Sequence, residues 1–346
     1  MATTAEKSAA DTATAPLNRK DFVTPNDVRW CPGCGDYAIL NSLQRTFPEL
    51  GVPRENFVVI SGIGCSSRFP YYMNTYGFHT IHGRAPAVAT GVKIANPDLS
   101  VWIVTGDGDG LSIGGNHLMH LLRRNLDCTV LLFNNRIYGL TKGQYSPTSP
   151  EGTRTKTTPT GSVDHPINPL LFALGAEATF IARTVDNNPK HMVEVFKAAH
   201  QHKGVSFVEI FQNCVIFNDA TWDPVYSKET RDEQMLFLET GKPLRFGKDK
   251  SKGIRLNGLV PEVVDAASVP ESELLVHQPD HPSPLYSQIL ATMGMPDFPT
   301  PVGVIRRIER PTYENQIHGQ VNEAKAKRGD LTIQQLLHGS STWTVE

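Results

Sequence analysis

The chain has 346 residues, and 33 basic side chains nearly balance 35 acidic ones, for a formal net charge of −2. This length can bury a sizeable core, and the small charge argues against nucleic acid or an anionic membrane surface as the partner. The longest apolar runs are only as long as β-strands, so no membrane span is expected. Residues 1–18 lack a signal core and an Arg-rich transit pattern, and we interpret them as a disordered lead-in to a cytoplasmic protein.

In chain order, helices and strands are predicted to alternate. The predicted elements are a helix over 35–47, strands over 57–60 and 79–82, a helix over 84–95, a strand over 101–105, a helix over 113–123, a strand over 129–133, a helix over 169–174, a strand over 178–182, a helix over 190–202 and a strand over 205–211. Because these strands are apolar on both faces, the predicted fold class is α/β, with a parallel sheet covered by helices on both faces.

The remaining segments are predicted from composition. Residues 141–168 are rich in Thr, Pro, Gly and Ser, which indicates a long ordered loop, and such loops in compact domains are usually functional. Beyond about residue 241 the pattern weakens. We therefore expect a core domain over 19–240 and an irregular C-terminal extension over 241–346 that wraps the core or a partner subunit.

Five cysteines occur, and an odd number without a secretion signal argues against a disulfide framework. Cys31 and Cys34 are spaced C-x2-C. On its own this pair is compatible with a redox disulfide, half of a zinc site, two ligands of an iron–sulfur cluster, or an incidental pair. Cys128 begins an apolar strand and is interpreted as a small buried hydrophobe.

Two motifs follow neighbouring predicted strands. Asp107 lies in GDGDG after the strand over 101–105, and Asn134-Asn135 come after the strand over 129–133. In an open parallel sheet both turns lie at the carboxyl edge, where ligands bind. A carboxylate with an amide oxygen suits Mg²⁺, and the glycines allow a diphosphate to approach the backbone. The pair therefore predicts a Mg²⁺–diphosphate site.

The combination of GDG and NN resembles the signature of thiamine diphosphate enzymes. More of the chain is similar to the β subunits of 2-oxoacid:ferredoxin oxidoreductases, above all those that act on 2-oxoglutarate. The resemblance is strong from Trp30 to about Asp223 and looser beyond. It is carried, in this order, by the motifs CPGCG, GIGCSS, HGRA, GDGDG, NNRIYGLTKGQ and NCV.

The resemblance implies a thiamine diphosphate-binding fold over 19–240 and assigns residues to three groups. As Mg²⁺ ligands it implies Asp107, Asn135 and the carbonyl of Ile137. As ligands of a [4Fe–4S] cluster it implies Cys31, Cys34, Cys65 and Cys214. Against thiamine diphosphate it implies Ile63, Gly64, Cys65, Ser66, His82, Gly106, Asp107, Gly108, Asp109, Asn135, Gly139, Leu140 and Thr141.

Three residues are candidates for a catalytic role. His82 and Arg84 follow a predicted strand and are placed to reach substrate or cofactor, with a structural role as the alternative. Lys142 is a candidate partner for a substrate carboxylate, against the alternative of a solvated loop lysine. Asp109 is either a second acid at the metal or a cap of its turn.

The implied reaction is oxidative decarboxylation of a 2-oxoacid with coenzyme A, with electrons passing through the cluster to ferredoxin. No convincing glutamate for activating the thiamine ring is found, so an α subunit is expected to supply it, in a dimer of αβ pairs. The alternatives are a pyruvate or branched-chain 2-oxoacid enzyme, a non-redox thiamine diphosphate lyase or synthase, and a zinc-binding scaffold subunit.

Overall fold

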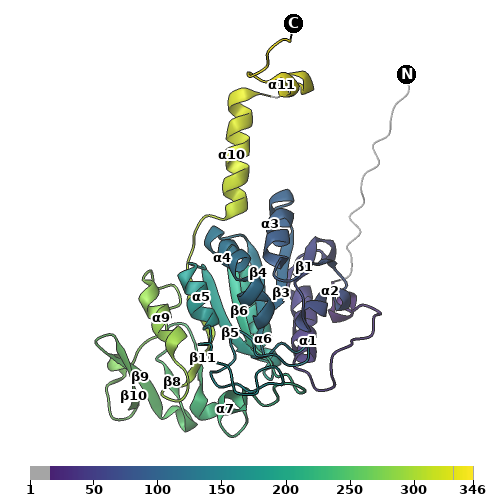
Figure 1. Cartoon of the computed structure of the whole chain (residues 1–346). Coiled ribbons are helices and arrows are strands. Elements are labelled where there is room, and N and C mark those ends of the chain that lie inside the picture. The colour runs from purple at the N-terminus through teal and green to yellow at the C-terminus, as the bar shows by residue number, and fades with distance from the viewer. Residues whose placement is uncertain (1–15, 330, 346) are drawn as a thin grey trace.

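The structure is a computed structural model that describes residues 16–329 and 331–345. Of the predicted lead-in, residues 1–15 lie outside the described residues. The centre of the fold is an eight-stranded sheet with the order β2-β1-β3-β4-β6-β5-β11-β7 (Figure 1). Its strands are β1 (Phe57–Ser61), β2 (Tyr76–His79), β3 (Ser100–Gly106), β4 (Cys128–Asn134), β5 (Phe180–Val185), β6 (Val205–Phe211), β7 (Met235–Phe237) and β11 (Thr300–Arg307).

The first six strands of this order are parallel neighbours, and β11 runs antiparallel to β5. The predicted α/β fold class is confirmed. The strand predicted over 79–82 was wrong in position, because β2 ends at His79 and His82 lies in the turn that follows. Periodicity could not place this strand, because all four β2 residues are exposed at the edge of the sheet.

Helices cover both faces of the sheet. The helices of the described residues are α1 (Asp36–Thr46), α2 (Phe69–Tyr72), α3 (Ala85–Ala95), α4 (Gly115–Arg124), α5 (Pro169–Gly175), α6 (Pro189–Gln201), α7 (Asp223–Tyr226), α8 (Arg231–Gln234), α9 (Pro284–Thr292), α10 (Tyr313–Arg328) and α11 (Ile333–His338). Several starts have a clear local cause. For example, Asn188 accepts a hydrogen bond from the backbone of His191, and Pro189 suits the first helical position of α6.

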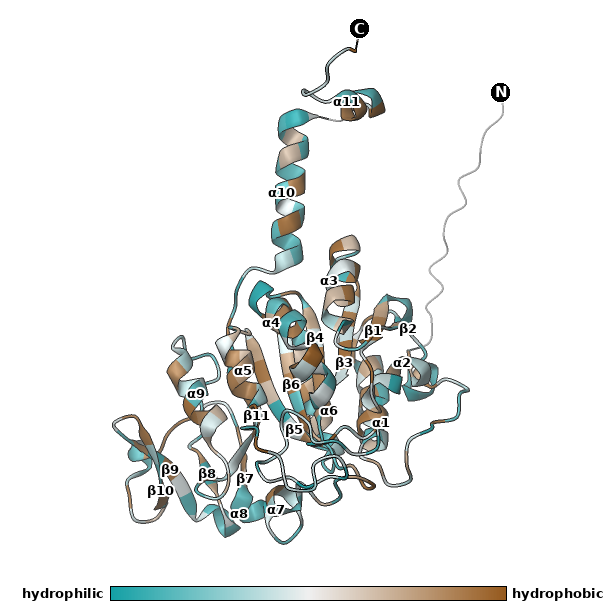
Figure 2. Ribbon diagram, viewed as in Figure 1, coloured by the Kyte–Doolittle hydropathy of each residue, from teal (hydrophilic) through white to brown (hydrophobic). Residues whose placement is uncertain are grey.

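Alternate residues of each central strand enter two separate cores. Val58 and Ile60 of β1 pack with α3 and α4, whereas Phe57 and Val59 pack with α1 and α6. Figure 2 shows hydrophobic residues concentrated on the sheet and on the helix faces turned toward it. Because a strand presents successive side chains to opposite faces, the double burial explains the continuous apolar runs in the sequence.

The C-terminal part carries regular structure that composition did not indicate. A three-stranded antiparallel sheet is formed by β8 (Arg245–Phe246), β9 (Lys252–Asn257) and β10 (Val260–Asp265), and β11 joins the main sheet. The division at residue 240 stays a prediction. None of the described helices is long and apolar enough to cross a membrane.

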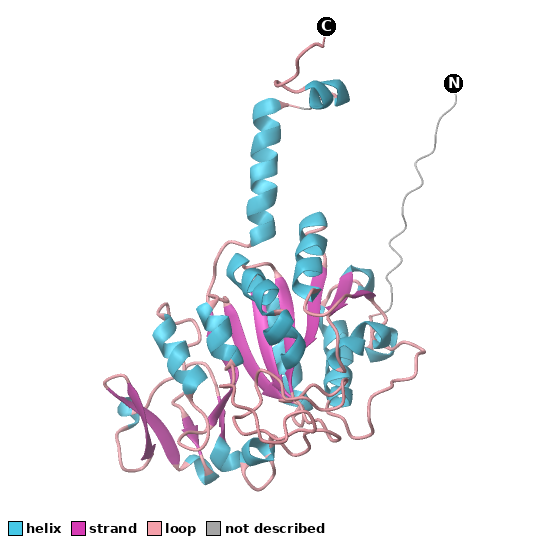
Figure 3. Cartoon of the chain, in the orientation of Figure 1, coloured by secondary structure: helices cyan, strands magenta, loops and turns pink. Residues whose placement is uncertain are grey.

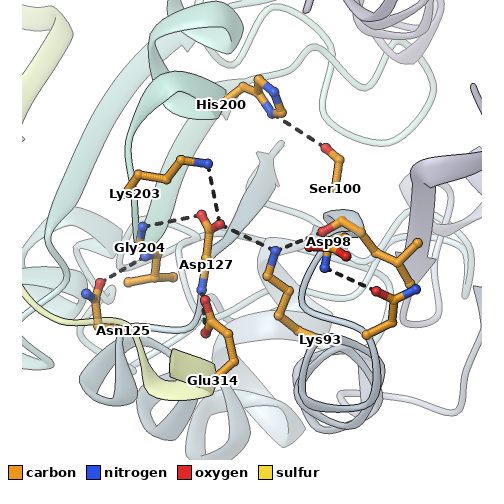
Figure 4. Close-up of polar contacts among 12 residues, drawn as sticks. Lys93, Asp98, Ser100, Asn125, Asp127, His200, Lys203, Gly204 and Glu314 are labelled. Atoms are coloured by element: carbon orange, nitrogen blue, oxygen red, sulfur yellow. Dashed lines mark hydrogen bonds and ion pairs between the residues drawn. The ribbon is translucent and has the colours of Figure 1, made fainter. Parts of the chain in front are cut away.

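The two ends of the parallel strands differ in character. At the carboxyl ends, long loops gather, including residues 141–168 (Figure 3). At the opposite edge, buried Lys93 forms an ion pair with Asp127, and the backbone N–H of Asp127 donates to Glu314 at the start of α10 (Figure 4). α10 then extends away from the body (Figure 1). The candidate site therefore lies at the end of the sheet remote from α10.

Candidate functional site: two adjoining cavities at the carboxyl edge

Sheet topology brings the predicted motifs together. β3 pairs with β4 through Gly106 and Phe133, and β4 pairs with β6 through Asn134 and Phe211. The turns that follow these three strands therefore lie side by side. β1 is the other neighbour of β3, so the GIGCSS loop joins the same edge.

The C-x2-C loop comes from before α1 and is tied to this edge by long-range hydrogen bonds. Trp30 Nε1 donates to the carbonyl of Cys65 at 2.7 Å, and Gly35 N donates to the carbonyl of Asn213 at 3.2 Å. A Cβ atom at Gly35 would overlap the Asp186 carboxylate, so this position requires glycine. These contacts place Cys31 and Cys34 beside the loops that carry Cys65 and Cys214.

All four predicted cluster cysteines line one cavity of about 220 Å³. The cavity is closed on one side by Gly139, where a Cβ atom would lie 3.6 Å from the sulfurs of both Cys65 and Cys214. Cys31 is exposed, whereas the other three are half-buried. Cys128 is buried in the core, as predicted from its strand. Among residues 16–329 and 331–345, no three His, Cys, Asp or Glu side chains gather closely enough to hold a single metal ion.

Two thiols of this cavity, Cys34 and Cys65, are unfavourable places for negative charge in the protein by itself. Burial, followed by the charge of Asp36 and the other thiols, raises the pKa of Cys65 to about 12 and raises that of Cys34 further. Thiolates would therefore require a strongly cationic group between them. A space of this size ringed by four sulfurs fits an iron–sulfur cluster, whose irons supply that charge.

A second cavity of about 100 Å³ adjoins the first. It is lined by all thirteen residues that the resemblance places against thiamine diphosphate, together with Ile137, Phe133 and Tyr138. The last two were missed by sequence reasoning. Tyr138 donates its hydroxyl to the carbonyl of Gly108 at 2.9 Å, and a Cβ atom at Gly108 would overlap its ring. The cavities share Cys65, Asn135, Gly139 and Leu140, so a group in one would border a group in the other.

Asp107 is held by the long loop that was predicted to be functional. Ser146 and Thr148 both donate to its Oδ2, at 2.5 and 2.6 Å. The side chain is 2% exposed, and burial raises the pKa of its carboxyl group. Within the described part of the chain no basic side chain forms an ion pair with it. A buried carboxylate without a countercharge fits a cation site.

Asn135 lies at the boundary of the two cavities. Its Oδ1 accepts from the backbone N–H of Ile137 at 3.1 Å, and its carbonyl accepts from Asn218 Nδ2 at 2.9 Å. The turn is further fixed by Trp222 Nε1, which donates to the carbonyl of Asn134 at 2.9 Å. Asp107, Asn135 and Ile137 thus line the same cavity, as a shared Mg²⁺ site requires.

Asp109 joins three loops. Oδ1 accepts from the backbone N–H groups of Ile63 at 3.1 Å and Gly83 at 2.8 Å, and Oδ2 accepts from Thr105 at 2.6 Å. His82 Nδ1 lies 2.5 Å from Oδ1. With both oxygens engaged by the chain, the carboxylate ties the GIGCSS loop and the HGRA turn to the end of β3 and shapes the cavity wall.

The three catalytic candidates fall in different places. His82 lines the smaller cavity, and Lys142 lines the thiol cavity. Arg84 is not among the described residues that line either one. Two further cations, Arg29 and Arg68, line the thiol cavity and were missed. Arg68 follows GIGCSS directly, so proximity to that motif was the available signal.

Comparison with known proteins agrees with this geometry. The family model described as "Thiamine pyrophosphate enzyme, C-terminal TPP binding domain" matches residues 62–210, which include Asp107 and Asn135. The chain is 53% identical over 338 residues to the 2-oxoglutarate oxidoreductase subunit KorB of Mycobacterium tuberculosis, covering 97% of this chain and 90% of that protein. It is also 48% identical over 208 residues to 2-oxoacid:ferredoxin oxidoreductase 2, subunit beta, of Aeropyrum pernix. That match covers 60% of this chain and 67% of that protein.

A solved structure is also similar. It is a 2-oxoglutarate:ferredoxin oxidoreductase from Magnetococcus marinus with 2-oxoglutarate, coenzyme A and succinyl-CoA bound. The TM-score is 0.75 at 34% sequence identity, over 94% of this chain and 97% of that chain. The likeness extends over nearly the whole chain, including the C-terminal part.

Proposed function

Because the chain belongs to the β subunits of 2-oxoacid:ferredoxin oxidoreductases, we propose that it forms part of an enzyme that converts 2-oxoglutarate, coenzyme A and oxidised ferredoxin into succinyl-CoA, CO₂ and reduced ferredoxin. The family resemblance found in the sequence is thereby confirmed. Membership also favours this reaction over a non-redox thiamine enzyme or a zinc scaffold, neither of which uses both cavities.

One observation carries the proposal: a cavity with a buried, uncompensated carboxylate adjoins a cavity ringed by four thiols. An enzyme that decarboxylates a 2-oxoacid and exports the electrons singly needs an organic cofactor next to an electron acceptor. Because Cys65 and Asn135 border both spaces, electrons would travel only a short distance between the two groups.

In the smaller cavity, Asp107, Asn135 and the carbonyl of Ile137 would hold Mg²⁺, and the glycines of GDGDG would face the diphosphate. When bound, thiamine diphosphate supplies the carbanion-stabilising chemistry that decarboxylation of a 2-oxoacid requires. Hydrogen bonds within the chain position this site: Ser146 and Thr148 donate to Asp107. Asp109 accepts from Thr105 and forms part of the cavity wall.

In the larger cavity, Cys31, Cys34, Cys65 and Cys214 would hold a [4Fe–4S] cluster, which supplies one-electron transfer when bound. Cys31 is the exposed member of the four. The face of the protein around Cys31 is therefore where we expect ferredoxin to approach.

The substrate is proposed from charge and from the relatives. Arg29 and Arg68 also line a third cavity, which shares Ile63, Gly64 and Leu140 with the smaller cavity. There they would provide cations for the second carboxylate of a dicarboxylic 2-oxoacid, and Lys142, at the thiol cavity, is the third candidate. Pyruvate and branched-chain 2-oxoacids lack that carboxylate. The Mycobacterium and Magnetococcus proteins are both named for 2-oxoglutarate.

The active site is proposed to be completed by an α subunit. Among the described residues that line the smaller cavity, no glutamate is present to activate the thiamine ring. We therefore propose an αβ pair, assembled as a dimer of such pairs, with the α subunit contributing that acid.

The test is reduction of ferredoxin or a viologen by the co-expressed αβ complex, purified without oxygen, with coenzyme A and a panel of 2-oxoacids. The expected result is thiamine- and Mg²⁺-dependent reduction that is fastest with 2-oxoglutarate, together with the EPR signal of a reduced [4Fe–4S] cluster. A preference for pyruvate would overturn the substrate. A colourless, zinc-containing complex would overturn the redox function.

A further inference from the structure

Gln212 lines the thiol cavity and contacts Asn135, which lines both cavities. It is the first residue after β6, and it is 1% exposed. Its backbone N–H donates to the carbonyl of Asn134 at 3.0 Å, so the residue is anchored to the turn that carries Asn135. A fully buried amide needs a partner for each of its polar atoms, and this one finds its partners in both sites.

The side chain of Gln212 connects a proposed metal ligand to a proposed cluster ligand. Asn135 Nδ2 donates to its Oε1 at 2.8 Å. Its Nε2 donates to the sulfur of Cys34 at 3.3 Å and to the carbonyl of Asn213 at 2.6 Å. The orientation of the amide is set by these partners, because the reverse orientation would place Oε1 against a carbonyl oxygen.

The contact with Asn135 determines which atom of that side chain faces the metal site. Because Asn135 Nδ2 is engaged by Gln212, its Oδ1 points the other way, on the side of Ile137. Mg²⁺ accepts oxygen ligands and not an amide NH₂ group. Gln212 therefore selects the amide orientation that can bind the metal.

The contact with Cys34 acts on the other site. A hydrogen bond to a cluster thiolate stabilises the reduced cluster more than the oxidised one, because reduction adds negative charge that is partly carried by the sulfurs. An N–H group from Gln212 would therefore raise the reduction potential of the cluster and make it a better acceptor.

We propose that Gln212 is a positioning residue that couples the two cofactor sites: it orients Asn135 toward the metal and raises the reduction potential of the cluster through Cys34. The proposal rests on the proposed function, since it requires both groups to be present. A single change at this residue should therefore affect two properties that are measured independently.

The test compares Gln212→Met and Gln212→Glu with wild type in the αβ complex. Methionine keeps the length of the side chain without its hydrogen bonds, whereas glutamate keeps an acceptor for Asn135 and removes the donor to Cys34. Gln44→Met is the matched control. Gln44 is also a buried glutamine, 3% exposed, but it donates to the carbonyl of Tyr72 and is not among the described residues that line either cavity.

The first readout is the cluster potential, from EPR-monitored titration with dithionite and mediators. Both Gln212 variants should titrate at a lower potential than wild type and Gln44→Met. The second readout is the Mg²⁺ concentration needed for thiamine diphosphate binding, which does not depend on cluster loading. It should rise about 10–100-fold in Gln212→Met and change little in Gln212→Glu.

Each half of the proposal has an outcome that overturns it. An unchanged potential in Gln212→Met would remove the role of the hydrogen bond to Cys34, and a shift seen only in Gln212→Glu would then be an effect of charge. An unchanged Mg²⁺ requirement in Gln212→Met would remove the role in orienting Asn135. If the wild-type complex itself shows no cluster signal, the proposed function fails together with the role of Gln212 at the cluster, and the Mg²⁺ readout alone then decides whether Gln212 orients Asn135.

Discussion

The buried ion pair behind the turn that carries Asn135 offers a stringent test of the energetics. Arg183 Nε of β5 lies 2.7 Å from Glu209 Oε2 of β6, and the two residues are direct neighbours across the sheet. They are 5% and 1% exposed. The other oxygen of Glu209 accepts from Asn134 Nδ2 at 2.7 Å, so this pair supports the turn that presents Asn135.

Arg183→Met should be strongly destabilising because it leaves the Glu209 carboxylate buried without its cation. Removing one partner of a buried pair costs about 3–5 kcal/mol. For a chain of this size that corresponds to a fall of roughly 6–10 °C in Tm, at about 2 °C per kcal/mol. The double variant Arg183→Met/Glu209→Gln should recover at least half of this loss, because glutamine is neutral and still accepts from Asn134.

The matched control is the pair between Arg245 Nη2 and Glu271 Oε2, which has the same 2.7 Å separation but side chains that are 29% and 70% exposed. Arg245→Met should cost less than about 1 kcal/mol, because water screens an exposed pair. Thermal unfolding followed by circular dichroism measures all of these variants. Equal losses of Tm in Arg183→Met and Arg245→Met would refute the reasoning that burial, and not distance, sets the cost.

Three further outcomes are expected. Cys65→Ser should lose the cluster and ferredoxin reduction while keeping part of the Mg²⁺–thiamine diphosphate binding. Cys128→Ala, which lies outside the cavity, is the control and should keep all three properties. Normal ferredoxin reduction by Cys65→Ser would contradict the assignment of Cys65 as a cluster ligand. Asp107→Asn should raise the Mg²⁺ concentration required for thiamine diphosphate binding by more than about 10-fold in a binding titration, because the metal loses its charged ligand; an unchanged requirement would exclude Asp107. Burial lowers the pKa of His277 to about 4, so below about pH 6.5 the unfolded chain binds a proton that the folded chain does not. As the pH falls from 6.5 to 4, the free energy of unfolding of the wild type should therefore fall, relative to that of His277→Gln, by up to about 1.4 kcal/mol per pH unit. Urea unfolding at a series of pH values measures this difference. Parallel pH profiles of the two proteins would contradict the lowered pKa of His277.

Much of the fold could be predicted because its signals are local. A strand such as β4, buried on both faces, is marked by its own apolar run, and α6 by its spacing and cap. By contrast, β2 has an exposed edge, and β11 pairs antiparallel with a strand more than a hundred residues earlier in the chain. Nothing within those segments specifies the neighbour, so composition indicated an irregular extension where β11 completes the sheet.

The residues proposed to face the cofactor could be brought together in advance for a topological reason. In a parallel sheet the carboxyl ends of adjacent strands share one edge, so motifs placed directly after β1, β3 and β4 must converge. The thirteen residues named from their motifs accordingly line one cavity. Sequence reasoning left Asp109 as either a second acid at the metal or a cap of its turn. Its carboxylate accepts hydrogen bonds from Ile63 and Gly83, which are more than 20 residues away in the chain, and no local pattern indicates such contacts.

By itself, then, the sequence determined the order of the elements as far as β6, the residue types available at the carboxyl edge and the family. Tertiary structure decided which side chains share an atom-to-atom contact. Gln212 shows the difference: its partners Asn135 and Cys34 are 77 and 178 residues away, and its role depends on the orientation of one buried amide. Hydrogen bonds act over about 3 Å, so only the folded chain, which closes those long loops, can specify them.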